Sequence, residues 1–132
     1  MTDTPMVPVS WGELLDKITI LEIKAARMTD VAKRTNVVTE LTLLSDIASA
    51  ARPQVADLTA DLKAVNEALW DIEDEIRDKE LAQAFDARFI ELARAVYVTN
   101  DRRAALKRQI NQALGSRLVE EKNYKPYIAD AK

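Results

Sequence analysis

The amino-acid sequence predicts an all-α fold, an antiparallel helical bundle of about four helices that contains one long helical hairpin. The chain has 132 residues but only two glycines and four prolines. Residues 54–114 contain neither glycine nor proline, whereas strands need frequent turn residues. Apolar residues also recur at alternating steps of three and four through most of this stretch. This periodicity is typical of amphipathic helices.

The same features divide the chain into one domain and two ends. The length suits a single domain, because domains of roughly 100–150 residues are the most common. Prolines gather near both ends, outside the periodic stretch. We therefore expect a flexible N-terminal arm over residues 1–9, a helical bundle over residues 10–115 and a polar C-terminal tail over residues 116–132.

The first helix is expected to begin after Ser10. This serine and the glutamate three residues later have the spacing of a capping box, in which both side chains accept hydrogen bonds from backbone N–H groups at a helix start. The helix that follows is apolar on more than one side, which indicates burial on two sides. A shorter second helix is expected from a cap at Thr35 or Asn36 to about Ala51, because the residue before Pro53 is disfavoured in the helical conformation.

The long hairpin is expected from two further helices. Apolar residues step by three and four without interruption through residues 55–76, which predicts a heptad seam of the coiled-coil type. The next helix begins after Asp86, a favourable capping residue. It carries a similar seam through residues 89–113, interrupted at Thr99 and Arg103. The connection between the two helices is short, so they are expected to be antiparallel neighbours.

The order of charges supports the same pairing. Folding the chain back near residue 83 places Asp74 and Asp78 beside Arg94 and Arg88. Exposed ion pairs contribute only a few tenths of a kcal/mol each. They are therefore expected to select the register of the hairpin rather than to supply its stability.

Composition and charge exclude several classes of function. Without cysteine or histidine, the chain has no disulfide, no thiolate nucleophile and no imidazole general base or ligand. A net charge of −3 gives no electrostatic reason to expect nucleic acid or a membrane surface as partner. No apolar run approaches the roughly 20 residues of a membrane span, and the N-terminus lacks the features of a signal peptide. We expect a cytoplasmic protein without metal or cofactor, and with neither a nucleic-acid nor a membrane partner.

The strongest candidate for a binding site is the polar interruption of the long seams. A buried arginine is costly unless it is paired, so Arg103 either forms an internal salt bridge, the commoner arrangement, or binds an anionic ligand. Polar and aromatic residues on neighbouring helix positions could line a cleft around it, or could be core side chains with satisfied polar tips. The candidate ligand-binding residues are Glu22, Lys24, Asn66, Trp70, Glu73, Tyr97, Asn100, Asp101 and Arg103.

Three sequence blocks resemble a known family. They are WGELLDKITILEIK at residues 11–24, AVNEALWDIEDEIR at residues 64–77 and FIELARAVYVTNDRRAALKRQIN at residues 89–111. Together they are similar to a bacterial domain-of-unknown-function family, over roughly residues 11–122. The resemblance implies no assigned reaction. It implies an association with glycosyltransferase-like and surface-polysaccharide proteins.

Two hypotheses about function follow. The first is a non-catalytic interaction or assembly module, because the sequence has long heptad seams and no resolved catalytic constellation. The seams exceed what one protomer can cover, so we predict a homodimer through the long hairpin and keep a further protein partner open. The alternative is a protein that binds a small anionic ligand, or a mutase- or lyase-like enzyme that uses Arg103, Glu22, Glu73, Asn66 and Lys24.

Overall fold

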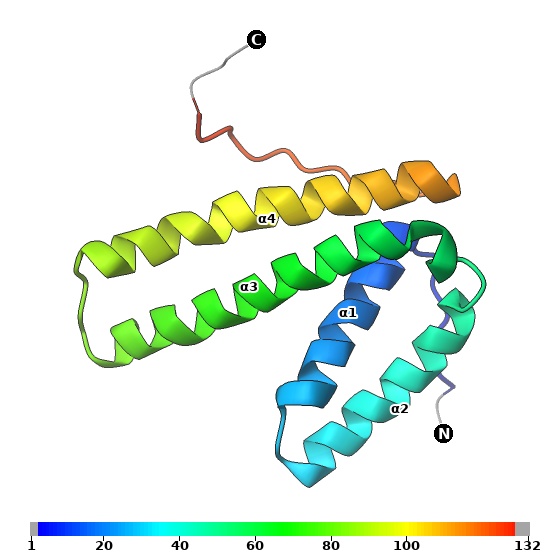
Figure 1. The fold of residues 1–132 in the computed structure, drawn as a ribbon, viewed down its shortest axis with the longest axis horizontal. Helices are drawn as coiled ribbons and strands as arrows, with labels where there is room; N and C mark the ends of the chain where they lie inside the picture. Colours follow the sequence, from blue (N-terminus) through cyan, green and yellow to red (C-terminus); the bar gives the residue numbers. More distant parts are fainter. Residues whose placement is uncertain (1–2, 129–132) are drawn as a thin grey trace.

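The computed structural model describes residues 3–128, and within them the chain forms four α-helices and one short 3-10 helix. These are α1 (Trp11–Arg27), α2 (Val31–Ala48), η1 (Arg52–Val55), α3 (Ala56–Leu81) and α4 (Ala87–Leu114). No strand occurs in this part of the chain. The predicted all-α bundle is confirmed, and so is the long hairpin, which α3 and α4 form (Figure 1).

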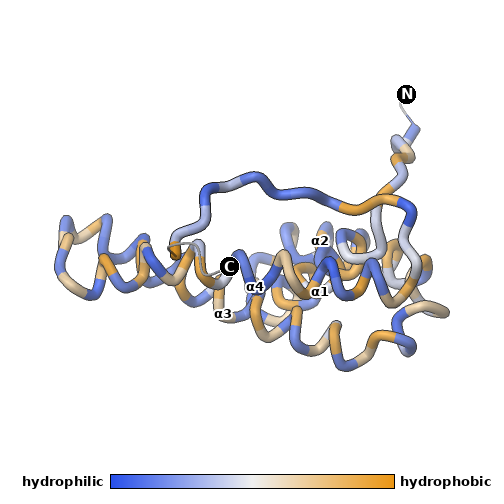
Figure 2. The backbone as a smooth tube through the Cα atoms, turned by 90° about the horizontal axis from the view of Figure 1, so that it is seen from above, coloured by the Kyte–Doolittle hydropathy of each residue, from blue (hydrophilic) through white to orange (hydrophobic). Residues whose placement is uncertain are grey.

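The helices form two hairpins that meet at one end. The helices α3 and α4 lie side by side, while α1 and α2 form a shorter pair that leans away from them (Figure 1). Helix α1 packs against α2, α3 and α4. Seen from above, the end of the long hairpin that contains its turn extends beyond α1 and α2 (Figure 2). We call the half of the hairpin that contains this turn, residues 69–98, the outer half of the hairpin.

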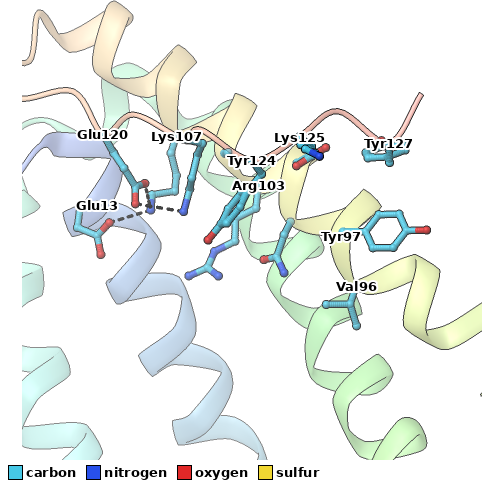
Figure 3. A pocket seen from close by; sticks show the side chains of 13 residues that line it. Glu13, Val96, Tyr97, Arg103, Lys107, Glu120, Tyr124, Lys125 and Tyr127 are labelled. Atoms are coloured by element: carbon cyan, nitrogen blue, oxygen red, sulfur yellow. Dashed lines mark hydrogen bonds and ion pairs between the residues drawn. The ribbon is translucent and has the colours of Figure 1, made fainter. Parts of the chain in front are cut away.

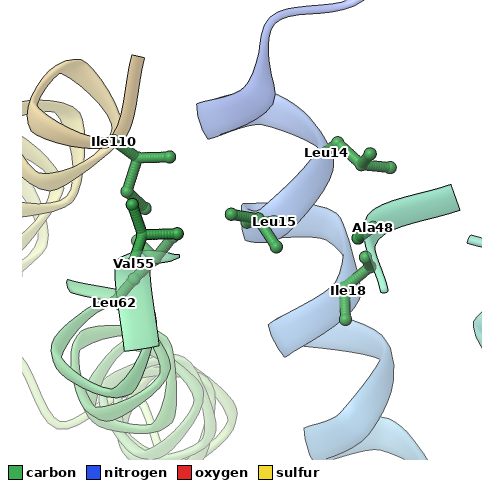
Figure 4. Close-up of a cluster of buried hydrophobic side chains, with 7 residues drawn as sticks. All are labelled: Leu14, Leu15, Ile18, Ala48, Val55, Leu62 and Ile110. Carbon is green, nitrogen blue, oxygen red and sulfur yellow. The ribbon is translucent and has the colours of Figure 1, made fainter. Parts of the chain in front are cut away.

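The hydrophobic core lies where α1 crosses the inner end of the long hairpin. Leu15 and Ile18 of α1 are fully buried and pack with Leu62 of α3 and Ile110 of α4 (Figure 4). Burying a side chain of this size stabilises the fold by about 1.5–3 kcal/mol. Ala48 of α2 joins the same cluster. The prediction that the first helix is buried on two sides is thereby confirmed.

The predicted helix starts at Ser10 and Asp86 are confirmed. The Ser10 hydroxyl accepts a hydrogen bond from the backbone N–H of Glu13 at 3.1 Å. The Asp86 carboxylate accepts one from the backbone N–H of Phe89 at 3.0 Å. Gly115 closes α4 with φ of +63°, in the left-handed region where a residue without Cβ carries no steric cost.

The predicted start of the second helix is wrong. Helix α2 begins after Asp30, whose carboxylate accepts a hydrogen bond from the backbone N–H of Lys33 at 2.9 Å. The helix runs through Thr35 and Asn36, the two residues expected to cap it. Threonine fits inside this helix because its hydroxyl donates to a carbonyl one turn earlier, as Thr35 does at 2.9 Å. The end of the helix at Ala48 lies close to the predicted one.

The turn of the long hairpin carries two salt bridges that differ from the predicted ones. Arg88 pairs with Glu75 at 2.7 Å, and Lys79 pairs with Asp86 at 2.9 Å. Neither of the two α3 aspartates expected here forms a salt bridge within residues 3–128. The acidic stretch offers several carboxylates in succession, and the rotation of α3 presents Glu75 rather than its neighbours to Arg88.

The ends of the chain contain no helix in the described region. Residues 3–9 precede the first cap, and residues 116–128 run back along α4 (Figure 1). We call residues 116–128 the C-terminal segment. The predicted flexibility of residues 1–9 stays a prediction, and residues 1–2 and 129–132 lie outside the described part. No helix of residues 3–128 is both long and apolar enough to cross a membrane.

Candidate functional site

A buried polar layer joins α1, α3 and α4. Asp16 of α1 is only 2% exposed. Its carboxylate accepts hydrogen bonds from Nε of Arg103 at 2.9 Å and from Nη2 of the same residue at 2.6 Å. Asn66 of α3 donates from Nδ2 to Asp16 at 2.9 Å and to the Thr19 hydroxyl at 3.0 Å. Arg103 is therefore paired inside the protein, as the internal salt-bridge interpretation expected.

The pairing accounts for an arginine on an apolar seam. The hydrogen bonds to Asp16 raise the pKa of the Arg103 guanidinium above its ordinary value, so the group stays charged. In residues 3–128, no buried side-chain nitrogen or oxygen lacks a hydrogen-bond partner. A layer of this kind is costly to break, because a lone buried charge would remain. It therefore ties α1 to one position along the hairpin.

A second ion-paired group lies one turn further along α4. The Lys107 ammonium donates to Glu13 of α1 at 2.7 Å and to Glu120 of the C-terminal segment at 2.8 Å. The Lys107 side chain is only 9% exposed. Burial alone would lower its pKa, but the hydrogen bonds to the two glutamates and the negative charges of Asp16 and Glu13 together outweigh burial and raise it. The hydrogen bond from Lys107 in turn lowers the pKa of Glu120.

The N-terminus of α1 sits directly against α4. The backbone N–H of Gly12 donates to Oδ1 of Asn111 at 2.7 Å. A Cβ at Gly12 would collide with the backbone carbonyl of Lys107. The backbone N–H of Trp11 donates to the Ser116 hydroxyl at 3.3 Å. Glycine is therefore required at position 12 by the close approach of two backbones.

A pocket of about 660 Å³ opens beside these ion pairs, between α4 and the C-terminal segment (Figure 3). Its volume lies within the range of small-molecule sites, roughly 300–1,000 Å³. Arg103 and Lys107 contribute to its inner wall, and three tyrosines contribute to its sides. The tyrosines are Tyr97 of α4 and Tyr124 and Tyr127 of the C-terminal segment.

Comparison with known proteins places the chain in a family. A model for a family of unknown function (DUF6165) matches residues 6–131. The chain belongs to the DUF6165 family. The resemblance to a domain-of-unknown-function family is thereby confirmed. No curated protein and no solved structure matches this DUF6165 chain.

The DUF6165 fold brings together about half of the predicted site residues. Tyr97, Asn100, Asp101 and Arg103 all line the pocket. Asn66 lies in the buried polar layer, where it donates to the same Asp16 carboxylate as Arg103. The prediction of a polar cluster around Arg103 therefore describes one wall of the pocket and the layer beneath it.

The remaining four predicted residues lie elsewhere in the DUF6165 fold and do not line the pocket. Glu22 pairs with Arg52 at 2.8 Å, where α1 meets η1. Glu73 forms a salt bridge along α3. The Trp70 ring lies under the guanidinium of an α1 arginine, 5.6 Å from its centroid. Lys24 lies in the last turn of α1.

The candidate residues predicted from the sequence do not include four residues that carry the site. They are Asp16, Glu13, Lys107 and Glu120. A signal for Asp16 was present, because an acidic residue stands among leucines and isoleucines on a helix expected to be buried on two sides. Lys107 follows Arg103 by one helical turn and so shares its face. For Glu120 no local pattern exists, since it lies in a segment without periodicity.

The described part of the chain gathers no cluster of three or more acidic side chains that could hold a metal ion. The expectation of a protein without metal or cofactor stays a prediction.

Proposed function

We propose that this DUF6165 protein is a non-catalytic interaction module that forms a homodimer through the outer half of its long hairpin. The observation that carries this proposal is the incomplete burial of the seam there. Toward the inner end, Leu62, Val65 and Ile110 are buried. In the outer half, Leu92 is the buried seam residue of the described chain, and the others are only half-buried. These are Leu69, Ile72, Ile76, Phe89 and Val96.

Further apolar side chains beside this seam are exposed. Phe85 is 53% exposed and Ile90 is 57% exposed. Val98 continues the exposed apolar surface along α4. Large exposed apolar side chains that gather on one part of a surface are typical of protein–protein contacts. Neither α1 nor α2 extends over the turn end of the hairpin (Figure 2).

Charge favours a second copy of the chain as the occupant. The outer half of α3 is mostly acidic over residues 71–80, whereas α4 presents Arg94 and Arg102, which are exposed and form no salt bridge within residues 3–128. A two-fold axis brings α3 of each copy against α4 of the other, because such an interface uses the same patch twice. Acidic and basic surfaces then meet on both sides of the apolar stripe.

The positions of the charged residues favour this proposal over a mutase- or lyase-like enzyme. Such an enzyme needs its Arg, Lys and Glu side chains to converge on one substrate. Glu22 and Glu73 are instead engaged in separate ion pairs, and neither lines the pocket that Arg103 borders. Five other expectations stay predictions. They are coiled-coil packing, a further protein partner, a cytoplasmic location, a bacterial source and an association with surface-polysaccharide proteins.

Light scattering coupled to size-exclusion chromatography tests the dimer. We expect a species of twice 14.8 kDa that dissociates on dilution. Ile90→Glu is expected to convert it to the monomer, because a charge enters the apolar stripe. Val31→Glu on α2 is the matched control, since Val31 is also apolar and is 80% exposed outside the hairpin. A monomer at every concentration would refute the dimer.

The second candidate function, binding of a small anionic ligand, is supported by the pocket between α4 and the C-terminal segment. Four of the predicted ligand-binding residues line it. The pocket lies on the side of α4 that carries Lys107 and Arg103, so basic side chains border a cavity of suitable size.

A further inference from the structure

We propose that the pocket beside α4 is an anion-binding site and that Glu120 of the C-terminal segment occupies its anion position. The external ligand is a small molecule that carries a phosphate or carboxylate group on a ring, and it competes with Glu120 for Lys107. This inference rests on the ligand-binding candidate function. It does not depend on dimerisation.

Lys107 is the centre of the anion position. Its ammonium is buried and forms salt bridges with two carboxylates, that of Glu13 at 2.7 Å and that of Glu120 at 2.8 Å. One carboxylate suffices to balance one ammonium, and Glu13 is held on α1. Glu120 lies on a segment without helix or strand and is 39% exposed. It can therefore leave Lys107 without disturbing any helix.

The pocket gains one net positive charge when Glu120 leaves. Four basic side chains line the pocket, and four acidic groups face them if Asp16 behind Arg103 is included. The basic ones are Arg103, Lys107, Lys122 and Lys125, and the acidic ones are Glu13, Asp16, Asp101 and Glu120. With Glu120 in place the charges balance, and without it one positive charge is uncompensated. An external anion restores the balance.

Additional hydrogen-bond donors surround the same position. Arg103 directs Nε and Nη2 to Asp16, while Nη1 makes no hydrogen bond within residues 3–128. Its side chain is 29% exposed and borders the pocket. Nζ of Lys122 already lies 3.3 Å from Oε2 of Glu120. An anion at the Glu120 position can accept charge-assisted hydrogen bonds from these groups, which are stronger than neutral ones.

The rest of the pocket fits a ring. A volume of about 660 Å³ is far larger than a bare phosphate needs. Tyr97 and Tyr127 pack against each other with ring centroids 5.1 Å apart. Tyr124 lines the same pocket as Arg103 and is 80% exposed (Figure 3). Tyrosine faces pack against planar rings and the apolar faces of sugars, so the ligand carries such a ring next to its anionic group.

Calorimetric titration of the full chain tests the site. The probes are phenyl phosphate, glucose 1-phosphate and benzoate, with inorganic phosphate for comparison. Glu120→Gln is expected to bind at least one ring-bearing probe about tenfold more tightly than the unmodified chain, equal to about 1.4 kcal/mol. Glu121→Gln is the matched control, because it removes the same charge from the next residue, and it is expected to leave binding unchanged.

Each result supports or overturns the proposal. The three ring-bearing probes distinguish phosphate from carboxylate and a planar ring from a sugar. Equal binding by Glu120→Gln and Glu121→Gln would show that Glu120 does not occupy the anion position. Inorganic phosphate that binds as tightly as every ring-bearing probe would overturn the role of the ring, and no binding of any probe would overturn the site.

Two further measurements separate the site from folding and from dimerisation. Lys125→Gln removes an exposed cation of the pocket, so it is expected to weaken binding while leaving the melting temperature unchanged. Light scattering on the same samples reports the oligomeric state. A failed dimer with intact binding, or the reverse, therefore identifies which of the two functions is wrong.

Discussion

The pairing of Arg103 with Asp16 makes a quantitative prediction for the variant Arg103→Met. Methionine keeps an apolar side chain on the seam but removes both hydrogen bonds to Asp16, at 2.9 and 2.6 Å. The Asp16 carboxylate is 2% exposed, so water cannot replace them. Asn66 remains as a single side-chain donor at 2.9 Å. Breaking a buried pair from one side costs about 3–5 kcal/mol, a large part of the roughly 5–15 kcal/mol that stabilises a domain.

Thermal and urea denaturation measure this loss. For a domain of this length, a change of 1 kcal/mol moves the melting temperature by about 4 °C, so we expect a fall of about 12–20 °C. Arg102→Met is the matched control, because Arg102 is exposed and makes no side-chain hydrogen bond in the described structure. It is expected to change the free energy of unfolding by less than about 0.5 kcal/mol.

A double-mutant cycle isolates the interaction itself. The double variant Asp16→Asn with Arg103→Met removes both charges, so it is expected to be more stable than Arg103→Met alone. If Arg103→Met is as stable as Arg102→Met, the salt bridge does not hold α1 in place. Arg103 would then be better explained as a residue kept for a ligand.

Two further predictions concern the contacts of α1 and of the C-terminal segment. Gly12→Ala brings a Cβ onto the backbone carbonyl of Lys107, and we expect a loss of about 1–3 kcal/mol in urea denaturation; unchanged stability would mean that the two backbones are not in close contact. The pKa of Glu120 is lower in the folded protein than its unfolded value of 4.5. Its contribution to the free energy of unfolding is therefore complete above pH 4.5 and is lost as the pH falls through the lower folded pKa. Amide NMR shifts of residues 116–128 are therefore expected to change as the pH falls below 4.5. Glu120→Gln should remove this dependence and Glu121→Gln should keep it, and a dependence that survives Glu120→Gln would contradict the assignment.

The predictable parts of the fold are those governed by local rules. Ser10 and Asp86 cap their helices because a side-chain oxygen reaches a backbone N–H three residues later, and this contact needs no knowledge of the rest of the chain. The long hairpin follows from a seam that repeats over many turns. The start of α2 was missed because Asp30 and Thr35 are both acceptable caps by local rules. Helix α2 is longer than predicted, and it packs against α1.

The site was less predictable, because its contacts join distant parts of the chain. Arg103 was recognised as a residue that needs a partner, but its partner lies 87 residues away on α1. Several acidic residues satisfied the same requirement, and only the rotation of α1 selects Asp16. The outer wall of the pocket comes from a segment with no periodic pattern. No rule of spacing could place Glu120 or Tyr124 against α4.

The two ion pairs that join α1 to α4 also form the inner wall of the pocket. Glu13 and Asp16 are three residues apart on α1, and Lys107 and Arg103 are four residues apart on α4, so the two helices meet through two successive salt bridges. Lys107 and Arg103 each direct some of their N–H donors inward to α1 and the others outward to the pocket. A ligand that binds there therefore binds only when α1 is correctly packed on the hairpin. Its binding energy adds to the stability of that packing, by about 2.7 kcal/mol at 100 times its dissociation constant. For the same reason, Arg103→Met is expected to weaken both the fold and the binding of any ligand in the pocket, whereas Lys125→Gln affects binding alone.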